Sequence, residues 1–394
     1  MNDESTSTKE RSTHLQTLYP LGFRHDAQEL SKMTVMFTLA YMLSIWSLST
    51  VSLIFMSRLG ETEFNASALA FTIYSLVSNT VMVGITYGSE TLLPQCYGGN
   101  KRKMGIIVQR SIIIAGYVCF IIWAILLNMK YILSLFMKNQ HTITLTDNIL
   151  RCYLFLVPLD ALALLLRSYI TSSGRIFPTV VIYLIGNIVN IISHYICLYH
   201  TDINIYSSPL SIILSYLTIV IGIIIYIRIS FFYEETWHPI THACLQEWNI
   251  YLKLALPGVM SSIITTWSFE LGNVFAASLT PRSLSAQAIV VQVIFFVSLN
   301  MMAVGDSSTI FIGQNLGANK PKEASNAKNV TYTLAIILSA INMILLAIIY
   351  WWLPYIFEAS ADTISLARSI LLWASLYSIM DGLNNVHLAI IKAW

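Results

Sequence analysis

The sequence predicts an all-α, polytopic membrane protein with two six-helix lobes related by a pseudo-two-fold repeat, the second lobe being truncated. Three observations predict this fold class. First, 56% of the 394 residues are hydrophobic and 11% are charged, whereas soluble domains carry roughly 25% charged residues. Second, apolar runs of about 20 residues, the length that crosses a bilayer, recur along the chain. Third, a motif at the end of one run recurs about six runs later, as expected of a membrane protein built from a duplicated unit.

Ten apolar stretches are long enough to cross about 30 Å of hydrocarbon. Each is expected to be a helix, because a lone strand leaves its backbone polar groups unsatisfied in lipid. The stretches lie at approximately 33–57, 66–94, 104–127, 150–172, 177–199, 209–232, 251–278, 284–312, 328–353 and 364–391.

Polar segments divide the predicted helices into units. Residues 1–32 form a cytoplasmic N-terminal segment that lacks the apolar core of a cleavable signal peptide. Residues 33–232 hold helices one to six, and residues 249–394 hold helices seven to ten. The polar segment 233–248 between them is the predicted cytoplasmic linker. If the first lobe is complete with six helices, two are missing from the second.

Basic residues gather in alternate loops, so the positive-inside rule places the N-terminus in the cytoplasm. Loops on the other side carry few of them. The basic residues that set this orientation are Lys9, Arg11, Arg24, Lys32, Lys101, Arg102, Lys103, Arg175, Lys320, Lys322 and Lys328.

The pattern Q-x-x-G-x-N-K-x-K occurs at residues 95–103 and again at 314–322, after the second and eighth predicted helices. Chance is the alternative explanation, since Gly, Asn and Lys are common in loops. A displacement by six spans favours duplication, and an even displacement preserves orientation, so the two lobes are expected to be parallel repeats.

Acidic residues inside apolar spans are candidate functional groups, because a charge at the bilayer centre costs about 2.5–3.5 kcal/mol on insertion scales. Glu270 is the first candidate for substrate and proton binding, since the neighbouring Trp267 and Phe269 could hold a cation. A carboxylate that takes either a proton or a cation would couple their movements. The alternative is an acid that only joins two helices. The acids within the spans are Glu90, Asp160, Glu270, Asp306 and Asp381.

The other acids have different expectations. Asp381 is the second candidate, and a structural pair with Lys392 is disfavoured because eleven residues of helix span about 16 Å. Glu90 is either part of a gate or a solvated helix end. Asp306, with Asn300 as a possible partner, and Asp160 are interpreted as structural.

Two further positions in the spans carry predictions. Asn187, one turn from Asn190, either touches substrate or ties helices together. Pro257 lacks an N–H and is predicted to kink or break the seventh helix beside the binding region.

These motifs resemble the multidrug and toxic compound extrusion (MATE) family, in particular its animal organic cation/proton exchangers, over nearly all of residues 25–394. The resemblance implies twelve core helices in two six-helix lobes around a central cavity, and it supports Asp381 as a site residue. The chain departs from the family with Thr265 and Gln292 in place of acids and Phe311 in place of a basic residue. The motifs are Gln95-x-Tyr97-Gly98, Val108-Gln109-Arg110-Ser111, Asn187-x-x-Asn190, Ala255-x-Pro257, Trp267-Ser268-Phe269-Glu270 and Gly313-x-x-Leu316-Gly317-Ala318.

The implied function is a secondary active antiporter that exports organic cations and xenobiotics in exchange for protons, with sodium as an alternative coupling ion. The expected partners are small organic cations and the lipid bilayer, without nucleic acid, and a monomer in the plasma membrane is expected. One alternative is a flippase-like transporter of lipid-linked substrates, which would need a cavity lined with Arg and Lys. Another is a non-transporting receptor or scaffold, which ten spans and a duplication disfavour.

An enzyme, a cofactor and a metal site are not expected. The sequence has no phosphate loop of the form GxxxxGK[ST]. The five cysteines show no CxxC spacing and are interpreted as packing residues. They are Cys96, Cys119, Cys152, Cys197 and Cys244.

Overall fold

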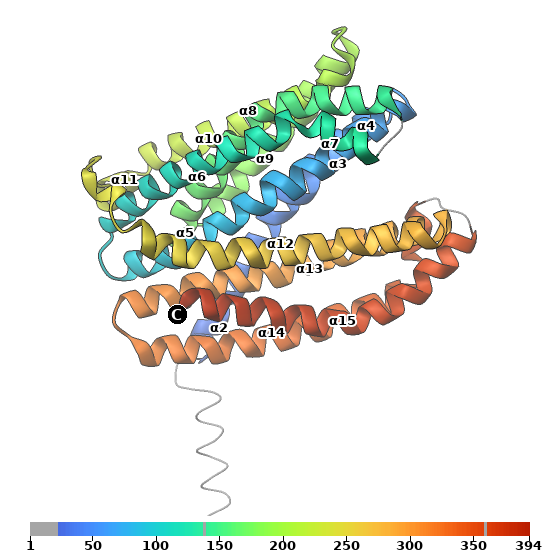
Figure 1. Ribbon diagram of the computed structural model, residues 1–394. Helices are drawn as coiled ribbons and strands as arrows, with labels where there is room; N and C mark the ends of the chain where they lie inside the picture. The colour runs from blue at the N-terminus through green and yellow to red at the C-terminus, as the bar shows by residue number, and fades with distance from the viewer. Residues whose placement is uncertain (1–22, 137–138, 358–360) are drawn as a thin grey trace, which may run out of the picture.

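The computed structural model describes residues 23–136, 139–357 and 361–394, and within these ranges every regular element is a helix (Figure 1). Most of the predicted N-terminal segment 1–32 lies outside the described residues, and the first described helix begins at Phe23, earlier than expected. The all-helical membrane fold class is therefore confirmed.

The helices fall into two consecutive groups that are joined by a short segment. The first group comprises α2 (Phe23–Tyr41), η1 (Met42–Ser47), α3 (Leu48–Met56), α4 (Glu61–Tyr74), η2 (Ser75–Asn79), α5 (Thr80–Gly98), α6 (Lys103–Leu127), α7 (Met129–Phe136), α8 (Gln140–Thr171), α9 (Phe177–Tyr199), η3 (Asn204–Tyr206) and α10 (Ser207–Ile229). The joining segment carries α11 (Phe232–Thr236) and η4 (His242–Leu245). The second group comprises α12 (Trp248–Leu279), α13 (Pro281–Gly317), α14 (Pro321–Ile349), η5 (Leu353–Phe357) and α15 (Ala361–Ala393).

Nine helical stretches among the described residues are long and apolar enough to cross a membrane, where the sequence predicted ten. They correspond to the second to tenth predicted stretches. The first, 33–57, lies on α2, η1 and α3 together. The π-helical segment Met42–Ser47 lies within this stretch, as η2 lies within the second one, and α2 carries several charged residues at its start. The first predicted stretch is therefore helical over nearly all of its length.

The fourth predicted span also needs a correction, because α8 begins at Gln140 and not near 150. Its first turns are polar and escaped the hydropathy pattern. The side chain of Asn139 caps this helix, accepting hydrogen bonds from the backbone N–H groups of His141 and Thr142 at 3.1 and 3.3 Å. Such a cap satisfies N–H groups that have no partner within the helix.

The order and length of the helices repeat between the two groups. The continuous helical run from Glu61 to Gly98 corresponds to α13, α6 corresponds to α14, and α8 corresponds to α15. Each pair is displaced by nearly the same distance along the chain as the repeated motif. This regularity supports the predicted duplication, while the lobe boundaries themselves stay a prediction.

The two groups meet along α5 and α2. Helix α5 packs against α12 and α13, and α2 packs mainly against α13 and α14, so the first described helix lies among helices of the second group (Figure 1). Helices α6, α8, α9 and α10 lie on the other side of the first group and share its apolar cores with α3, α4 and α5. The interface therefore consists of helices that bring residues from both ends of the chain together.

The segment 233–248 is docked on α6. Gln109 donates a hydrogen bond to the His238 carbonyl at 2.7 Å, and Arg110 donates one to the Ala243 carbonyl at 3.2 Å. Gly105 leaves room for this contact, since a Cβ there would lie 2.5 Å from the His238 nitrogen. The predicted linker is thus fixed against the first group over part of its length.

Candidate functional site

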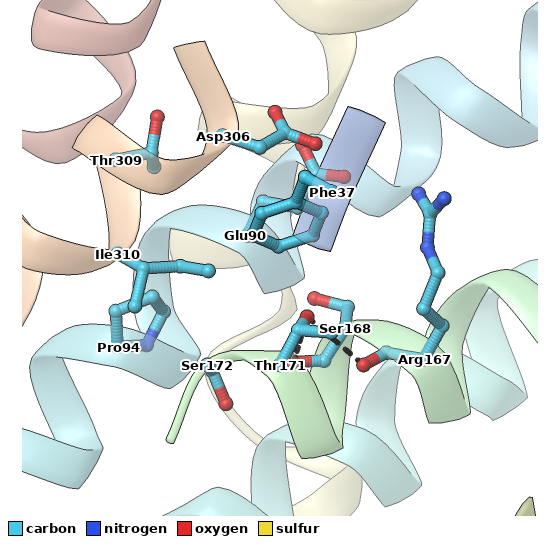
Figure 2. Close-up of a pocket in the computed structure, with 10 residues that line it drawn as sticks. All are labelled: Phe37, Glu90, Pro94, Arg167, Ser168, Thr171, Ser172, Asp306, Thr309 and Ile310. Atoms are coloured by element: carbon cyan, nitrogen blue, oxygen red, sulfur yellow. Dashed lines mark hydrogen bonds between the residues drawn. The ribbon is translucent and has the colours of Figure 1, made fainter. Parts of the chain in front are cut away.

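A small cavity lies where α2, α5, α8 and α13 meet (Figure 2). Three charged side chains line it: Glu90 from α5, Arg167 from α8 and Asp306 from α13. The free space admits only about one or two water molecules. In this state the cavity can hold water or a small ion and is too small for an organic cation. The other lining residues are Phe37, Pro94, Ser168, Thr171, Ser172, Thr309 and Ile310.

Glu90 forms an ion pair with Lys392 near the end of α15. The Nζ–Oε2 distance is 3.1 Å, and the side chains are 15% and 10% exposed. The ammonium group also lies 3.2 Å from the centroid of the Tyr87 ring. Of the two expectations for Glu90, the solvated helix end is therefore wrong, because the carboxylate is buried and paired across the interface.

Asp306 connects α13 to α2. Tyr41 donates a hydrogen bond from its hydroxyl to the Asp306 carboxylate, and the guanidinium carbon of Arg167 lies 5.3 Å from the centroid of the Tyr41 ring. The predicted partner, Asn300, instead exchanges hydrogen bonds with Asn342 at 2.9 Å. With Lys392 counted beside Glu90, two acids and two bases balance around the cavity.

Glu270 lies on α12, away from this cavity. Its half-buried carboxylate accepts a hydrogen bond from Asn273 at 3.2 Å. Trp267, nearly one turn earlier, is 49% exposed. The two residues lie on the same helix at the spacing that predicted a joint cation site. About half of the surface of Trp267 is exposed.

Asp381 is held between α15 and α13. Ser298 donates a hydrogen bond to its carboxylate at 2.7 Å, and Asn385 donates another at 3.1 Å. Ser298 also lines a second small cavity within the second group, together with Tyr377 and Ser378. Lys392 bonds to Glu90 instead, so Asp381 has only neutral partners among the described residues.

Asn187 lies at the contact between α9 and η1. Its amide donates to the carbonyls of Leu43 and Tyr183, both at 2.8 Å, and the residue is 4% exposed. Of the two expectations for Asn187, these contacts match the one that ties helices together. The bond to Leu43 supports the π-helical segment, whose backbone departs from the regular helical pattern.

Pro257 does not end its helix. Helix α12 runs without interruption from Trp248 to Leu279, and Pro257 lies on its exposed side. The helix is therefore continuous at Pro257, and the kink that the sequence predicts stays a prediction. Proline removes one N–H and leaves one carbonyl without its helical partner, and a long helix can continue through such a defect.

Two acids that line the cavity have partners that were not in the predicted set, Tyr41 at Asp306 and Lys392 at Glu90. The lining residue Arg167 was not in that set either. Asp160, which was interpreted as structural, accepts hydrogen bonds from Tyr74 and Asn79 at 2.7 and 3.3 Å. A sequence signal did exist, since a base within an apolar span requires a compensating acid. It could not show which acid, because Glu90 and Lys392 are 302 residues apart.

A family model described as MatE matches residues 38–196 and 257–393. The chain belongs to the MatE family. The predicted resemblance is thus confirmed, and both matched ranges cover the helices that build the interface. Membership makes the chain a multi-pass membrane protein of a transporter family and not an enzyme.

Curated relatives in this family include animal proteins named multidrug and toxin extrusion protein 1. The Xenopus tropicalis protein is 31% identical over 89% of this chain, and the human protein is 26% identical over 83%. These alignments cover 61% and 58% of the relatives. The chain therefore spans about three fifths of the length of the curated relatives it matches.

Solved structures of MATE transporters share the fold. The eukaryotic transporter AtDTX14 superposes with a TM-score of 0.87 at 18% identity, covering 94% of this chain and 84% of that chain. The Vibrio cholerae transporter VcmN in its bent form gives a TM-score of 0.84 at 15% identity, covering 95% and 85%. At these identities the likeness establishes the fold of this family member and no finer property.

Proposed function

We propose that this MatE protein is a secondary active antiporter that exports organic cations in exchange for protons. The relatives named as extrusion proteins support the transport direction. The coupling and the substrate class rest on the acids of the second group. We propose Glu270 and Asp381 as the groups that bind substrate and proton, with Trp267 as an aromatic neighbour.

One observation carries the proposal: Glu270 and Asp381 accept hydrogen bonds from neutral side chains, whereas Glu90 has a basic partner. No salt bridge to either acid is present in the described part of the chain. A carboxylate already neutralised by lysine has little reason to take up a proton or a cation. A carboxylate with only neutral partners can do both.

The proposed exchange follows from competition for one carboxylate. A proton bound to the acid removes its charge and with it the attraction for a cation. Binding of the cation requires that the proton leave. If the carrier changes its open side only when one of the two is bound, an inward proton gradient drives the cation outward.

A flippase-like transporter of lipid-linked anions is less well supported. Arg167 and Lys392 do lie at the cavity region, but Asp306 and Glu90 balance them. A site for a large anion needs an excess of positive charge. A receptor or scaffold function has no supporting feature beyond the membrane helices, and family membership favours transport.

The test is efflux of a fluorescent organic cation from sealed vesicles under an imposed pH gradient. We expect gradient-dependent efflux by the unaltered chain and its loss in Glu270→Gln and Asp381→Asn, which keep the side-chain size and remove the charge. Glu234→Gln, an exposed acid in α11, is the matched control and should transport normally.

Sodium is the alternative coupling ion, and the same assay decides between them. Efflux that persists in sodium-free potassium buffer supports proton coupling, whereas efflux that follows a sodium gradient at equal pH overturns it. Efflux unaffected by both acid substitutions would remove Glu270 and Asp381 from the site.

The placement of the protein is part of the proposal. The N-terminus and the basic loops are proposed to face the cytoplasm, and the protein is proposed to act in the plasma membrane as a monomer, without a cofactor. Labelling of an introduced cysteine at the exposed Lys322 from one side of intact cells measures the orientation.

A further inference from the structure

The two copies of the repeated motif contact each other reciprocally. A Cβ at Gly98 would lie 2.0 Å from the carbonyl oxygen of Gln314, and a Cβ at Gly317 would lie 1.9 Å from the carbonyl oxygen of Gln95. In each copy a glycine therefore meets the backbone of the other copy's glutamine. Only glycine permits α5 and α13 to approach this closely.

The two glutamine side chains are also used reciprocally, because each donates a hydrogen bond to a helix of the other group. Gln95 donates to the carbonyl of Ala393 at the end of α15, at 2.9 Å, and Gln314 donates to the carbonyl of Ser172 at the end of α8, at 2.7 Å. Each bond runs from one group of helices to the other. Carbonyls in the last turn of a helix commonly lack a partner within the helix, so each amide supplies a missing donor.

These contacts adjoin the cavity. Pro94 and Ser172 both line it; Pro94 precedes Gln95 in the chain, and Ser172 accepts the bond from Gln314. The ion pair from Lys392 to Glu90 holds the last turns of α15 to α5 a second time. The contacts lie where α5, α8, α13 and α15 end, beside the basic loops (Figure 1).

We propose that Gln95, Gln314, Gly98 and Gly317 form a two-fold latch that closes the cavity at the end of the molecule that carries the basic loops. The latch joins the two groups by backbone contact at the glycines and by one amide bond on each side. Its role as a gate that opens in every cycle rests on the proposed transport function. The closure itself does not, and it can be measured without any substrate.

The reciprocity predicts how the latch fails. Alanine at either glycine cannot be accommodated by a side-chain movement, because the atom it meets belongs to the backbone. The two helices must separate, which opens a path to the cavity. Loss of one glutamine amide removes a single bond, so Gln95→Leu and Gln314→Leu should have similar, smaller effects that combine in the double variant.

The experiment measures access to a cysteine in the cavity. Ser168, which lines the cavity and is 6% exposed, is replaced by cysteine in a chain whose five native cysteines are replaced by serine or alanine. A membrane-impermeant methanethiosulfonate reagent is applied to sealed vesicles. A separate Lys322→Cys variant shows which side of the vesicles carries the basic loops.

From the side of the basic loops, we expect Gly98→Ala and Gly317→Ala to raise the labelling rate of Ser168→Cys by at least about tenfold, the factor that corresponds to about 1.4 kcal/mol. Gly116→Ala is the matched control, because a Cβ there meets nothing within 4 Å. Its labelling rate should equal that of the parent.

The outcomes separate clearly. Equal labelling in the Gly98→Ala, Gly317→Ala and Gly116→Ala variants overturns the latch. If the glycine variants do not fold, the double variant Gln95→Leu with Gln314→Leu is tested instead, since leucine adds no Cβ clash. A labelling rate of Ser168→Cys that is unchanged from the parent then overturns the latch. Faster labelling without cation efflux would support the latch and contradict only the proposed transport function.

Discussion

Lys392 and Glu90, 302 residues apart in the sequence, form a buried ion pair with an Nζ–Oε2 distance of 3.1 Å. The pair joins α15 to α5 across the interface between the two groups of helices. Lys392 was not among the predicted site residues, and its ammonium group compensates the charge of the predicted site residue Glu90. Its energetic and structural consequences can be measured separately from transport.

Replacing one partner of this pair should be more damaging than replacing both. Lys392→Met leaves the Glu90 carboxylate buried without compensation, which typically costs about 3–5 kcal/mol for a buried pair. The double variant Lys392→Met with Glu90→Gln should recover much of this loss. The measurement is the thermal unfolding midpoint of purified protein in detergent.

A matched control is Lys320→Met. Lys320 pairs with Glu323 at 3.1 Å, but both side chains are 55% exposed, and exposed pairs contribute about 0–1 kcal/mol. A double variant that is as unstable as Lys392→Met would contradict the interpretation of the pair as mutually compensating.

Close packing between α5 and α12 should make Gly84 intolerant of a side chain. A Cβ at Gly84 would lie 2.3 Å from the Cα of Val259, so Gly84→Ala should destabilise the protein by about 1–3 kcal/mol through overpacking. Gly116→Ala should be neutral or slightly stabilising, because alanine favours the helix by up to about 1 kcal/mol. Unfolding in a denaturant series compares the two, and equal stability of the variants would exclude the tight contact.

The bond from Asn187 to the Leu43 carbonyl should contribute modestly to stability. Hydrogen bonds between membrane helices average about 0.6 kcal/mol and reach about 1.7, so Asn187→Leu should lower the unfolding midpoint by a few degrees at most. Transport should persist if this residue ties helices together. Loss of cation efflux at unchanged stability would instead indicate contact with substrate.

Docking of the joining segment on α6 should protect it from proteases. Arg110, whose side chain is 5% exposed, binds the Ala243 carbonyl and pairs with Glu247 at 3.3 Å. Arg110→Ala should speed chymotryptic cleavage near Trp237 and Trp248, as followed by gel electrophoresis. Arg102→Ala, at an exposed position, is the control. Unchanged cleavage in Arg110→Ala would show that other contacts hold the segment.

Much of the fold could be predicted from the sequence because hydropathy is a local property. Nine of ten predicted spans correspond to helices in the described ranges that are long and apolar enough to cross a membrane, and the repeat of residues 95–103 at 314–322 corresponds to a physical contact. The misplaced start of the fourth span has a local cause as well, because polar first turns hid the start of α8.

The candidate site was less predictable. Acids within spans could be recognised individually, and Glu90 does lie at a cavity, but neither Tyr41 nor Lys392 carried a signal that named its partner. Helix α12 is continuous through Pro257, because a proline weakens one position of a helix and its neighbours decide whether the helix continues.

The sequence by itself determined that the chain carries many apolar helices of membrane-spanning length and that it resembles its family, and it predicted the duplication. Each of these depends on residue type and spacing along one dimension. Only the tertiary structure decided which charges neutralise each other and which glycines meet, since Lys392 reaches Glu90 and Gly98 reaches Gln314 across the interface. The physical reason is that compensation of charge and close backbone contact require proximity in space, and proximity between residues far apart in the chain arises only when the helices pack.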